Sequence, residues 1–448
     1  MTLRALILGT LVLLPPGCVL APEGTRQQEA RLTRAGMQYD QPFDKRRLPE
    51  LSDSPTWREV LHRALSANGD LEAAYFQWAA AISRVRQQAA WPAMNIDLGA
   101  EYMFSSGKMK SWDRTTVAVR QEGLALPIKA TQAGRVALAE AQAAGERFRA
   151  AKFDVQHRVL TQWIDYALLA ERTRIMTENA SLLRLLADTA ANRVRAGAQQ
   201  QDLLKAQIEL QLAENDLANM QAEATQMRAM LNAMLARPAD APLSPPQAMP
   251  EPREATADDA AILAMGVGNN PELSALAEEV RGRANALELA RMRYIPDFQL
   301  SAGFTGSVSQ FIGGMLSLPT AVPMIRGAIR EARAELGRME AMRRQTTLDR
   351  AARFVAVLYA MRNSERQAKL LRERILPAAR LVMDNSLQAY STGAIGFVEL
   401  IDSQRTLLEV RLLVAEALAA RERSLIELEA LAGTDIETLD ASATQPTN

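Results

Sequence analysis

A turn between two helical stretches is the feature that most constrains this 448-residue chain. One helical stretch ends at Tyr390, Gly393 follows it, and a second helical stretch begins a few residues later. The second stretch carries an apolar residue at every seventh position, at Leu400, Leu407 and Val414. Glycine readily adopts the left-handed conformation that ends a helix, and a spacing of seven keeps one seam turned toward a partner helix. The pattern predicts the tip of an antiparallel helical hairpin.

The same pattern occurs earlier in the chain, after Gly197. A shift of 197 positions aligns an earlier set of apolar residues with the later one, namely Leu203, Leu210 and Leu217. Self-similarity over such a long period indicates a duplicated architecture. We therefore predict two repeats, at residues 51–236 and 256–433, with tips near 197 and 393. A Pro-rich linker or equatorial region at 237–255 would join them.

Each repeat also contains a segment in which apolar and polar residues alternate. The alternation runs from Ile96 to Phe104 in the first repeat and from Phe298 to Phe304 in the second. This is the pattern of a strand with one apolar face. A loop that carries glycine and serine follows each strand, and a return strand follows the loop. The sequence predicts two β-hairpins, at about residues 94–126 and 297–319.

Long helices follow the hairpins. Residues 133–195 contain no proline, and at about 1.5 Å per residue they would span on the order of 90 Å. The corresponding helix of the second repeat, residues 325–390, contains Pro377, which we expect to kink it.

The residue inventory argues against an enzyme and against a metal centre. Two histidines, His62 and His157, and a single cysteine cannot supply a cluster with metal-ligand spacing. The sequence has no phosphate-binding glycine loop and no nucleophile elbow. Its formal net charge is zero, which gives no reason to expect a nucleic-acid partner. We expect a protein that is not an enzyme and that uses no cofactor or metal.

The first residues have the pattern of an export signal. Arg4 precedes an apolar run from Leu6 to Leu14, which is too short to span a bilayer. Cys18 after Gly17 resembles the end of a bacterial lipoprotein signal peptide, residues 1–17, and such a cysteine would carry palmitate. An ordinary secretory signal with an incidental cysteine is the alternative. The predicted tails are an extended N-terminal one at 18–50 and a disordered C-terminal one at 434–448.

Four strands cannot stand alone in a bilayer. Strands of about ten residues have the length of tilted transmembrane strands, and a bilayer tolerates no open sheet edge. Four are too few to close into a barrel, whereas three chains would contribute about twelve and enclose an aqueous channel. The alternative is a pair of ordinary hairpins in a soluble α+β protein. The export signal, the duplication and the long helices favour the shared barrel.

Several motifs resemble the TolC-like outer-membrane factor family, the exit ducts of Gram-negative efflux and secretion systems. They are Ile375-Leu376-Pro377, Tyr390-Ser391-Thr392-Gly393 and Leu400-Ile401-Asp402-Ser403-Gln404-Arg405. The resemblance covers about residues 51–435 and is greatest for the lipoprotein branch paired with resistance-nodulation-division pumps. It implies a mainly α-helical homotrimer in which a twelve-stranded transmembrane β-barrel continues into a periplasmic α-helical barrel.

The resemblance also implies roles for individual residues. Acidic residues after the second tip line the periplasmic constriction in that family, which here places the gate on Glu399 and Asp402; a solvated helix face is the alternative. Polar links hold the constriction shut, which assigns a latch to Tyr390 and Asp202. An arginine that adds a second link in some members is Ile395 here. The tips that would contact a periplasmic adaptor are Arg195, Ala196, Gly197, Ala198, Thr392, Gly393 and Ala394.

By this resemblance the chain is an outer-membrane channel of a tripartite efflux system. It would passively conduct drugs, toxic compounds or metal ions that an adaptor and an inner-membrane pump deliver to it. Two alternatives stay open, namely an exit duct for type I protein secretion and a lipid-tethered periplasmic coiled-coil scaffold. The 19 methionines form no spaced motif, so the sequence does not decide between a metal and an organic cargo.

Overall fold

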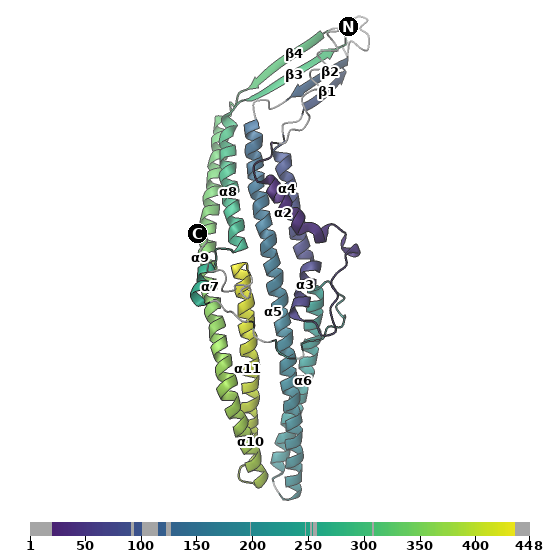
Figure 1. The fold of residues 1–448 in the computed structure, drawn as a ribbon, viewed down its shortest axis with the longest axis vertical. Helices are drawn as coiled ribbons and strands as arrows, with labels where there is room; N and C mark the ends of the chain where they lie inside the picture. Colours follow the sequence, from purple (N-terminus) through teal and green to yellow (C-terminus); the bar gives the residue numbers. More distant parts are fainter. Residues whose placement is uncertain are drawn as a thin grey trace, which may run out of the picture. The chain divides into compact units, whose positions relative to one another are not determined.

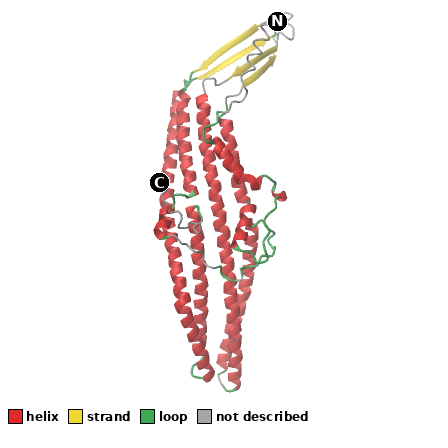
Figure 2. Cartoon of the chain, in the orientation of Figure 1, coloured by secondary structure: helices red, strands yellow, loops and turns green. Residues whose placement is uncertain are grey.

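The computed structural model describes residues 20–90, 94–100, 115–121, 127–197, 199–246, 248–250, 253, 258–306 and 309–434. The predicted signal peptide, Cys18, Ala198 and the predicted tail after residue 434 lie outside these residues. The described chain is mainly helical and contains a four-stranded sheet (Figures 1 and 2).

The two repeats have the same order of elements, as predicted. The first contains α3 (Trp57–Ala67), α4 (Gly69–Gln88), β1 (Met94–Ala100), β2 (Thr115–Gln121), α5 (Pro127–Arg195) and α6 (Gln200–Met234). The second contains α7 (Asp259–Met265), α8 (Pro271–Arg291), β3 (Asp297–Thr305), β4 (Ser309–Ser317), α9 (Val322–Leu370), α10 (Leu376–Thr392) and α11 (Phe397–Ala432). Short turns of other helical types are η1 (Met37–Tyr39), η2 (Phe43–Lys45), η4 (Met292–Tyr294) and the π-helical η5 (Leu371–Ile375). The predicted duplication of helices, β-hairpin and long helical arms is confirmed.

The chain divides into two compact units, which we describe separately. The first comprises Met1–Met37, Ala73–Phe148 and Pro271–Thr347 and contains the sheet. The strands are antiparallel in the order β1-β2-β3-β4, so the hairpin of one repeat pairs with that of the other. Val117 of β2 lies opposite Phe304 of β3 in this pairing. Within the described chain, β1 and β4 each have a free edge.

A helix, α2 (Thr25–Gly36), forms where the sequence predicts an extended tail. None of its buried residues is a large apolar one, so the sequence offers no helical periodicity to detect. Tertiary contacts hold the helix instead. Arg86 donates to Glu29 at 2.7 Å, and Arg31 donates to Glu146 at 3.1 Å.

The second unit comprises Gln38–Glu72, Arg149–Asn270 and Leu348–Asn448 and contains both helical hairpins. One apolar cluster joins α7, α9 and α11, and a second joins α5 to α11. The described part of the predicted linker packs on this unit. The hydroxyl of Tyr166 donates to the carbonyl of Leu243 at 2.9 Å.

The helices are interrupted at two places, of which the one at Pro377 is predicted from the sequence. The side-chain oxygen of Asn68 accepts from the backbone N–H groups of Asp70 at 3.0 Å and Leu71 at 3.2 Å, which caps the start of α4. Pro377 lies in the first turn of α10, directly after η5. Because proline has no N–H, the regular hydrogen-bond ladder is broken there, and the π-helical turn accommodates the break.

Close helix packing at Gly134 of α5 allows a test of this fold. A Cβ atom at Gly134 would lie 2.8 Å from the Cβ of Ala89 and 3.1 Å from the ring of Pro22, so these segments would have to separate. We expect Gly134→Ala to destabilise the protein by about 1–3 kcal/mol. A Cβ at Gly337 of α9 meets open space within the described chain, so Gly337→Ala should stabilise by about 0.5–1 kcal/mol. Thermal unfolding followed by circular dichroism measures both changes, and a Gly134→Ala protein as stable as wild type would contradict the packing.

Candidate functional site

Both helical hairpins of the second unit end in tight tips (Figure 1). Gly393, with φ of 79°, ends α10, and the N–H of Ala394 donates to the carbonyl of Ala389 at 2.8 Å. Gly197, with φ of 99°, follows α5, and its N–H donates to the carbonyl of Val194 at 3.0 Å. Both glycines therefore make the left-handed turns that the sequence predicts.

A shared apolar cluster packs the first hairpin against the second. Helix α6 contributes Ala206 and Ala213, with Leu210 and Leu217 partly buried beside them. These positions alternate in steps of three and four residues, which is the seam of a coiled coil. The other fully or largely buried members include Leu183, Leu186, Met383, Tyr390, Phe397 and Leu400.

Tyr390, in the last turn of α10, is 1% exposed. Its ring meets the ring of Phe397 edge-on, with centroids 5.7 Å apart. The guanidinium carbon of Arg193 lies 4.4 Å from the Tyr390 ring centroid, and Nη1 of Arg193 donates to the Tyr390 carbonyl oxygen at 2.9 Å. Arg193 thus joins the tip of the first repeat to the tip of the second.

The hydroxyl of Tyr390 is buried and has no hydrogen-bond partner in the part of the chain that the structure describes. Burial raises the pKa of the Tyr390 phenol, while the Arg193 charge opposes this rise and the Asp202 charge adds to it. The phenol therefore stays protonated at neutral pH and can donate. Asp202 lies in the first turn of α6, but within this single chain Tyr390 does not donate to it.

The two acids of the predicted gate lie on the first turns of α11. Glu399 and Asp402 are exposed, and neither carboxylate forms an ion pair among the described residues. A separation of three residues puts them on one face of the helix. The predicted adaptor contacts that the structure describes are all exposed, namely Arg195, Ala196, Gly197, Thr392, Gly393 and Ala394.

Further polar contacts link the two hairpins, and we call them the cross-hairpin links. The buried amide of Gln404 donates to Asn179, and Arg405 donates to Glu209. Arg411 of α11 pairs with Glu178 of α5. Arg423 and Asp165 form another pair at 2.7 Å. Together with Arg193, these side chains hold the second hairpin against the first by charge and hydrogen bonding as well as by apolar packing.

One face of the sheet of the first unit is mainly apolar, and the opposite face is mixed, because it also carries Phe311 and Met315 of β4. Directly paired residues lie on the same face of an antiparallel sheet. One row across the apolar face consists of Ile96, Val119, Ala302 and Ile312, of which Ile96 is 69% and Ile312 is 75% exposed. One row across the opposite face consists of Asn95, Arg120, Ser301 and Gly313. The apolar face is therefore bare in the described chain, which is unfavourable in water.

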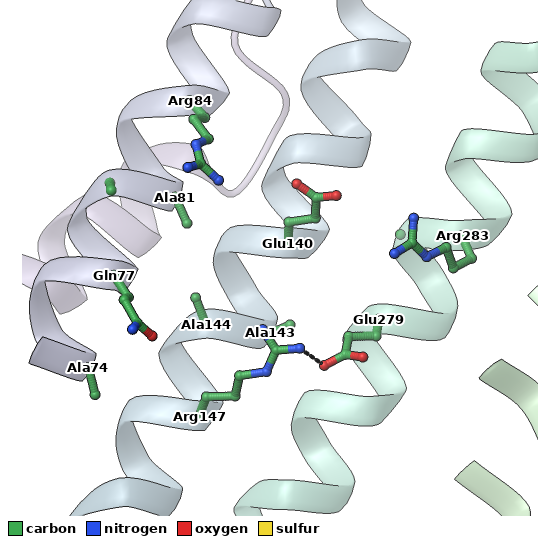
Figure 3. Close-up of a pocket in the computed structure, with 12 residues that line it drawn as sticks. Ala74, Gln77, Ala81, Arg84, Glu140, Ala143, Ala144, Arg147, Glu279 and Arg283 are labelled. Atoms are coloured by element: carbon green, nitrogen blue, oxygen red, sulfur yellow. Dashed lines mark hydrogen bonds and ion pairs between the residues drawn. The ribbon is translucent and has the colours of Figure 1, made fainter. Parts of the chain in front are cut away.

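A hollow of about 390 Å³ lies on the helices of the first unit (Figure 3). Small side chains such as Ala81, Ala143 and Ala144 line it, and Arg147 of α5 donates to Glu279 of α8 across it. The described residues that line it are Ala, Gly, Gln, Arg and Glu, with no nucleophile beside a base. The hollow is lined by charged and small side chains without a catalytic arrangement, and we assign it no reaction.

Two further properties concern the described residues as a whole. No group of three or more His, Cys, Asp or Glu side chains among them is placed to hold a metal ion. None of the described helices combines the length and the apolar character needed to cross a bilayer.

Sequence reasoning did not find Arg193 or the Asn179–Gln404 pair. Both contacts join residues far apart in the chain, 197 positions for Arg193 and Tyr390 and 225 for Gln404 and Asn179. The repeat offset of 197 itself would have paired Arg193 with Tyr390, since the two occupy equivalent positions. The contact between Arg193 and Tyr390 could have been detected by asking which residues at equivalent positions of the two repeats can contact each other, instead of which residues are of the same type.

The sequence is similar to two characterised proteins, although no protein-family model matches it. It is 24% identical over 291 residues to the cobalt-zinc-cadmium resistance protein CzcC of Cupriavidus metallidurans, which covers 61% of this chain and 65% of CzcC. It is 28% identical over 324 residues to protein CyaE of Bordetella pertussis, which covers 68% of each. The match thus spans just under two thirds of the length of CzcC.

The fold is that of solved outer-membrane channels. The Campylobacter jejuni CmeC outer membrane channel superimposes with a TM-score of 0.72 and 13% identity, over 86% of this chain and 88% of CmeC. At this identity the likeness concerns the fold.

The link between Arg411 and Glu178 makes the hairpin contact sensitive to acid. The hydrogen bond from Arg411 lowers the pKa of Glu178 below its usual 4.5. The stabilisation is therefore present above pH 4.5 and is lost as the pH falls through the folded-state pKa. We expect Glu178→Gln to lower the melting temperature at pH 7, and the difference from wild type to shrink below that pKa. Glu171→Gln, which removes a pair within α5 only, is the control; equal pH profiles for both variants would contradict the link.

Proposed function

This chain has the TolC-like fold of the outer-membrane factors, and on that premise we propose that it is the outer-membrane exit duct of a tripartite efflux system. It conducts its cargo passively and catalyses no reaction. It lies in the Gram-negative outer membrane, with its helices in the periplasm. Its similarity to CzcC, a protein named for resistance to cobalt, zinc and cadmium, supports toxic compounds or metal ions as the cargo.

The single observation that carries this proposal is the sheet. Its two edge strands lack outer neighbours in the described chain, and its apolar face is exposed. Backbone groups in a lipid bilayer must all be hydrogen-bonded, so an open sheet there has to close with strands from other chains. Three copies would supply about twelve strands, with the apolar face toward lipid and the opposite, more polar face toward an aqueous lumen.

Exposed apolar stripes on the helices support a homotrimer. Leu204, Ile208 and Leu212 recur every fourth residue on α6 and are 51%, 55% and 56% exposed. On α9, Leu348 and Tyr359 are 61% and 60% exposed. Contiguous exposed apolar surface marks a site of protein contact, and neighbouring subunits are the occupants that a closed barrel requires.

The proposed exit duct also implies its protein partners. The exposed tips at Gly197 and Gly393 meet a periplasmic adaptor, and an inner-membrane pump of the resistance-nodulation-division type supplies the energy. Ala198, in the first tip, belongs to this contact by its position in the sequence. A type I secretion exporter in place of the pump is the competing arrangement, and co-purification of the adaptor with one or the other pump distinguishes them.

The periplasmic gate consists of Glu399 and Asp402. Around a threefold axis these exposed acids would place six carboxylates at a narrow opening, where they attract cations and repel one another. A latch between the Tyr390 phenol and Asp202 holds this opening shut. The buried, unpartnered hydroxyl and the influence of the Asp202 charge on it support this role.

Cys18 carries the lipid that anchors the mature N-terminus. Metabolic labelling with palmitate should mark the wild-type protein and be lost in Cys18→Ser, because the cysteine is the residue that would carry the lipid. Label that persists in Cys18→Ser would contradict lipidation at this residue.

Single-channel conductance in planar bilayers tests the duct and its gate. The wild type should show a small, cation-preferring conductance, and Glu399→Ala/Asp402→Ala should lose that preference because the ring of carboxylates is gone. Asp384→Ala, which removes an exposed acid of the partner helix α10, is the control and should keep it. Asp202→Ala should leak more current when closed, and an unchanged closed state would remove the latch.

The outcomes separate the proposals. Conductance that is indifferent to Glu399 and Asp402 keeps the duct and discards the gate. A stable protein that is monomeric and silent in bilayers contradicts the duct, and it favours the lipid-tethered scaffold.

A further inference from the structure

Arg193 connects the two repeats at their tips by two contacts with one residue. Its guanidinium carbon lies 4.4 Å from the Tyr390 ring centroid, and its Nη1 donates to the Tyr390 carbonyl oxygen at 2.9 Å. A planar guanidinium can stack on an aromatic face and donate from its edge at the same time, which an ammonium group cannot. We call this pair of contacts the tip staple.

The carbonyl oxygen in the staple lies in the last turn of α10. Carbonyl groups there lack partners within the helix, and a cation is favourable at this negative end of the helix dipole. The same oxygen also accepts from the N–H of Gly393 at 3.1 Å. Arg193 therefore binds the point at which α10 ends and the turn into α11 begins.

We infer that Arg193 is a positioning residue for the periplasmic gate, an inference that rests on the proposed function. By fixing the end of α10 and the Gly393 turn against the first tip, it sets the place of the first turns of α11. Those turns carry Glu399 and Asp402. Moving the second tip away from the first breaks the staple, so the staple favours the closed arrangement.

The staple is distinct from the latch between Tyr390 and Asp202. It consists of contacts with the ring face and the backbone carbonyl of Tyr390, whereas the latch would use the hydroxyl. Ile395, which stands where some relatives have an arginine, packs against the apolar cluster between the hairpins. The positive charge at the contact between the two tips is therefore that of Arg193, from the first repeat.

Arg195 provides a matched control at the same tip. It is exposed, lies two residues from Arg193, and donates to Asn192 of its own helix at 3.1 Å. Arg193→Ala and Arg195→Ala remove the same charge from the same turn, and only the first removes the staple.

Conductance of the full-length trimer in planar bilayers is the first test. Arg193→Ala should raise the closed-state conductance about fivefold, as expected when one partly buried cation–π contact and one charged hydrogen bond are lost. Arg195→Ala should match wild type. Tyr390→Phe keeps both staple contacts and should leak less than Arg193→Ala. Equal conductance for Arg193→Ala and Arg195→Ala would overturn the staple.

Hydrogen exchange of the detergent-solubilised protein tests the staple without any conduction. Amides of residues 389–400 should exchange about fivefold faster in Arg193→Ala than in Arg195→Ala, because local opening of the second tip becomes easier. If Arg193→Ala exchanges faster but the protein never conducts, the staple is supported and the duct is contradicted. Equal exchange in both variants would reject the staple, even if the protein conducts.

Discussion

The two free edges of the sheet are the constraint on which the rest of the structure depends. Backbone N–H and C=O groups along β1 and β4 need partners that the described chain does not supply, and the exposed apolar face disfavours water as the surrounding medium. In the proposed trimer, strands of neighbouring copies would pair with the free edges, and lipid would surround the apolar face. In the proposed trimer, the exposed apolar residues of α6 and α9 would face neighbouring subunits.

The tips balance opposing interactions. Apolar packing joins the hairpins, whereas the acids of the proposed gate would repel one another once three copies meet. Exposed ion pairs such as Arg405–Glu209 contribute only about 0.2–1 kcal/mol each. The cation–π contact of Arg193 with the buried ring of Tyr390 contributes about 0.5–2 kcal/mol. The hydrogen bond from Arg193 to the Tyr390 carbonyl adds to this stabilisation. Arg193 should therefore outweigh any single exposed pair in holding the tips together.

Local, periodic signals made most of the fold predictable. Heptad spacing, the glycines at both tips and the alternation in the strands each act within a few residues, so the sequence displays them directly. Helix α2 was not predictable, because polar residues form its buried side and contacts with Glu146 and Arg86 hold it. Among the candidate site residues, Glu399 and Asp402 were proposed from a motif, whereas Arg193 was missed because its partner lies 197 positions away.

The duplication supplies an internal comparison that shows where the repeats have diverged. Leu203 aligns with Leu400 and Gln207 with Gln404, yet Leu400 and Gln404 are buried at 0% and 3% while Gln207 is exposed. A buried polar pair such as Gln404–Asn179 fixes the register of a coiled coil, at a cost in stability that an apolar pair would avoid. The second repeat therefore has its hairpin held in a defined register against the first. A proposed gate built from Glu399 and Asp402 needs such a register, because a slip of one helical turn would move both acids by about 5.4 Å along the helix relative to the first hairpin.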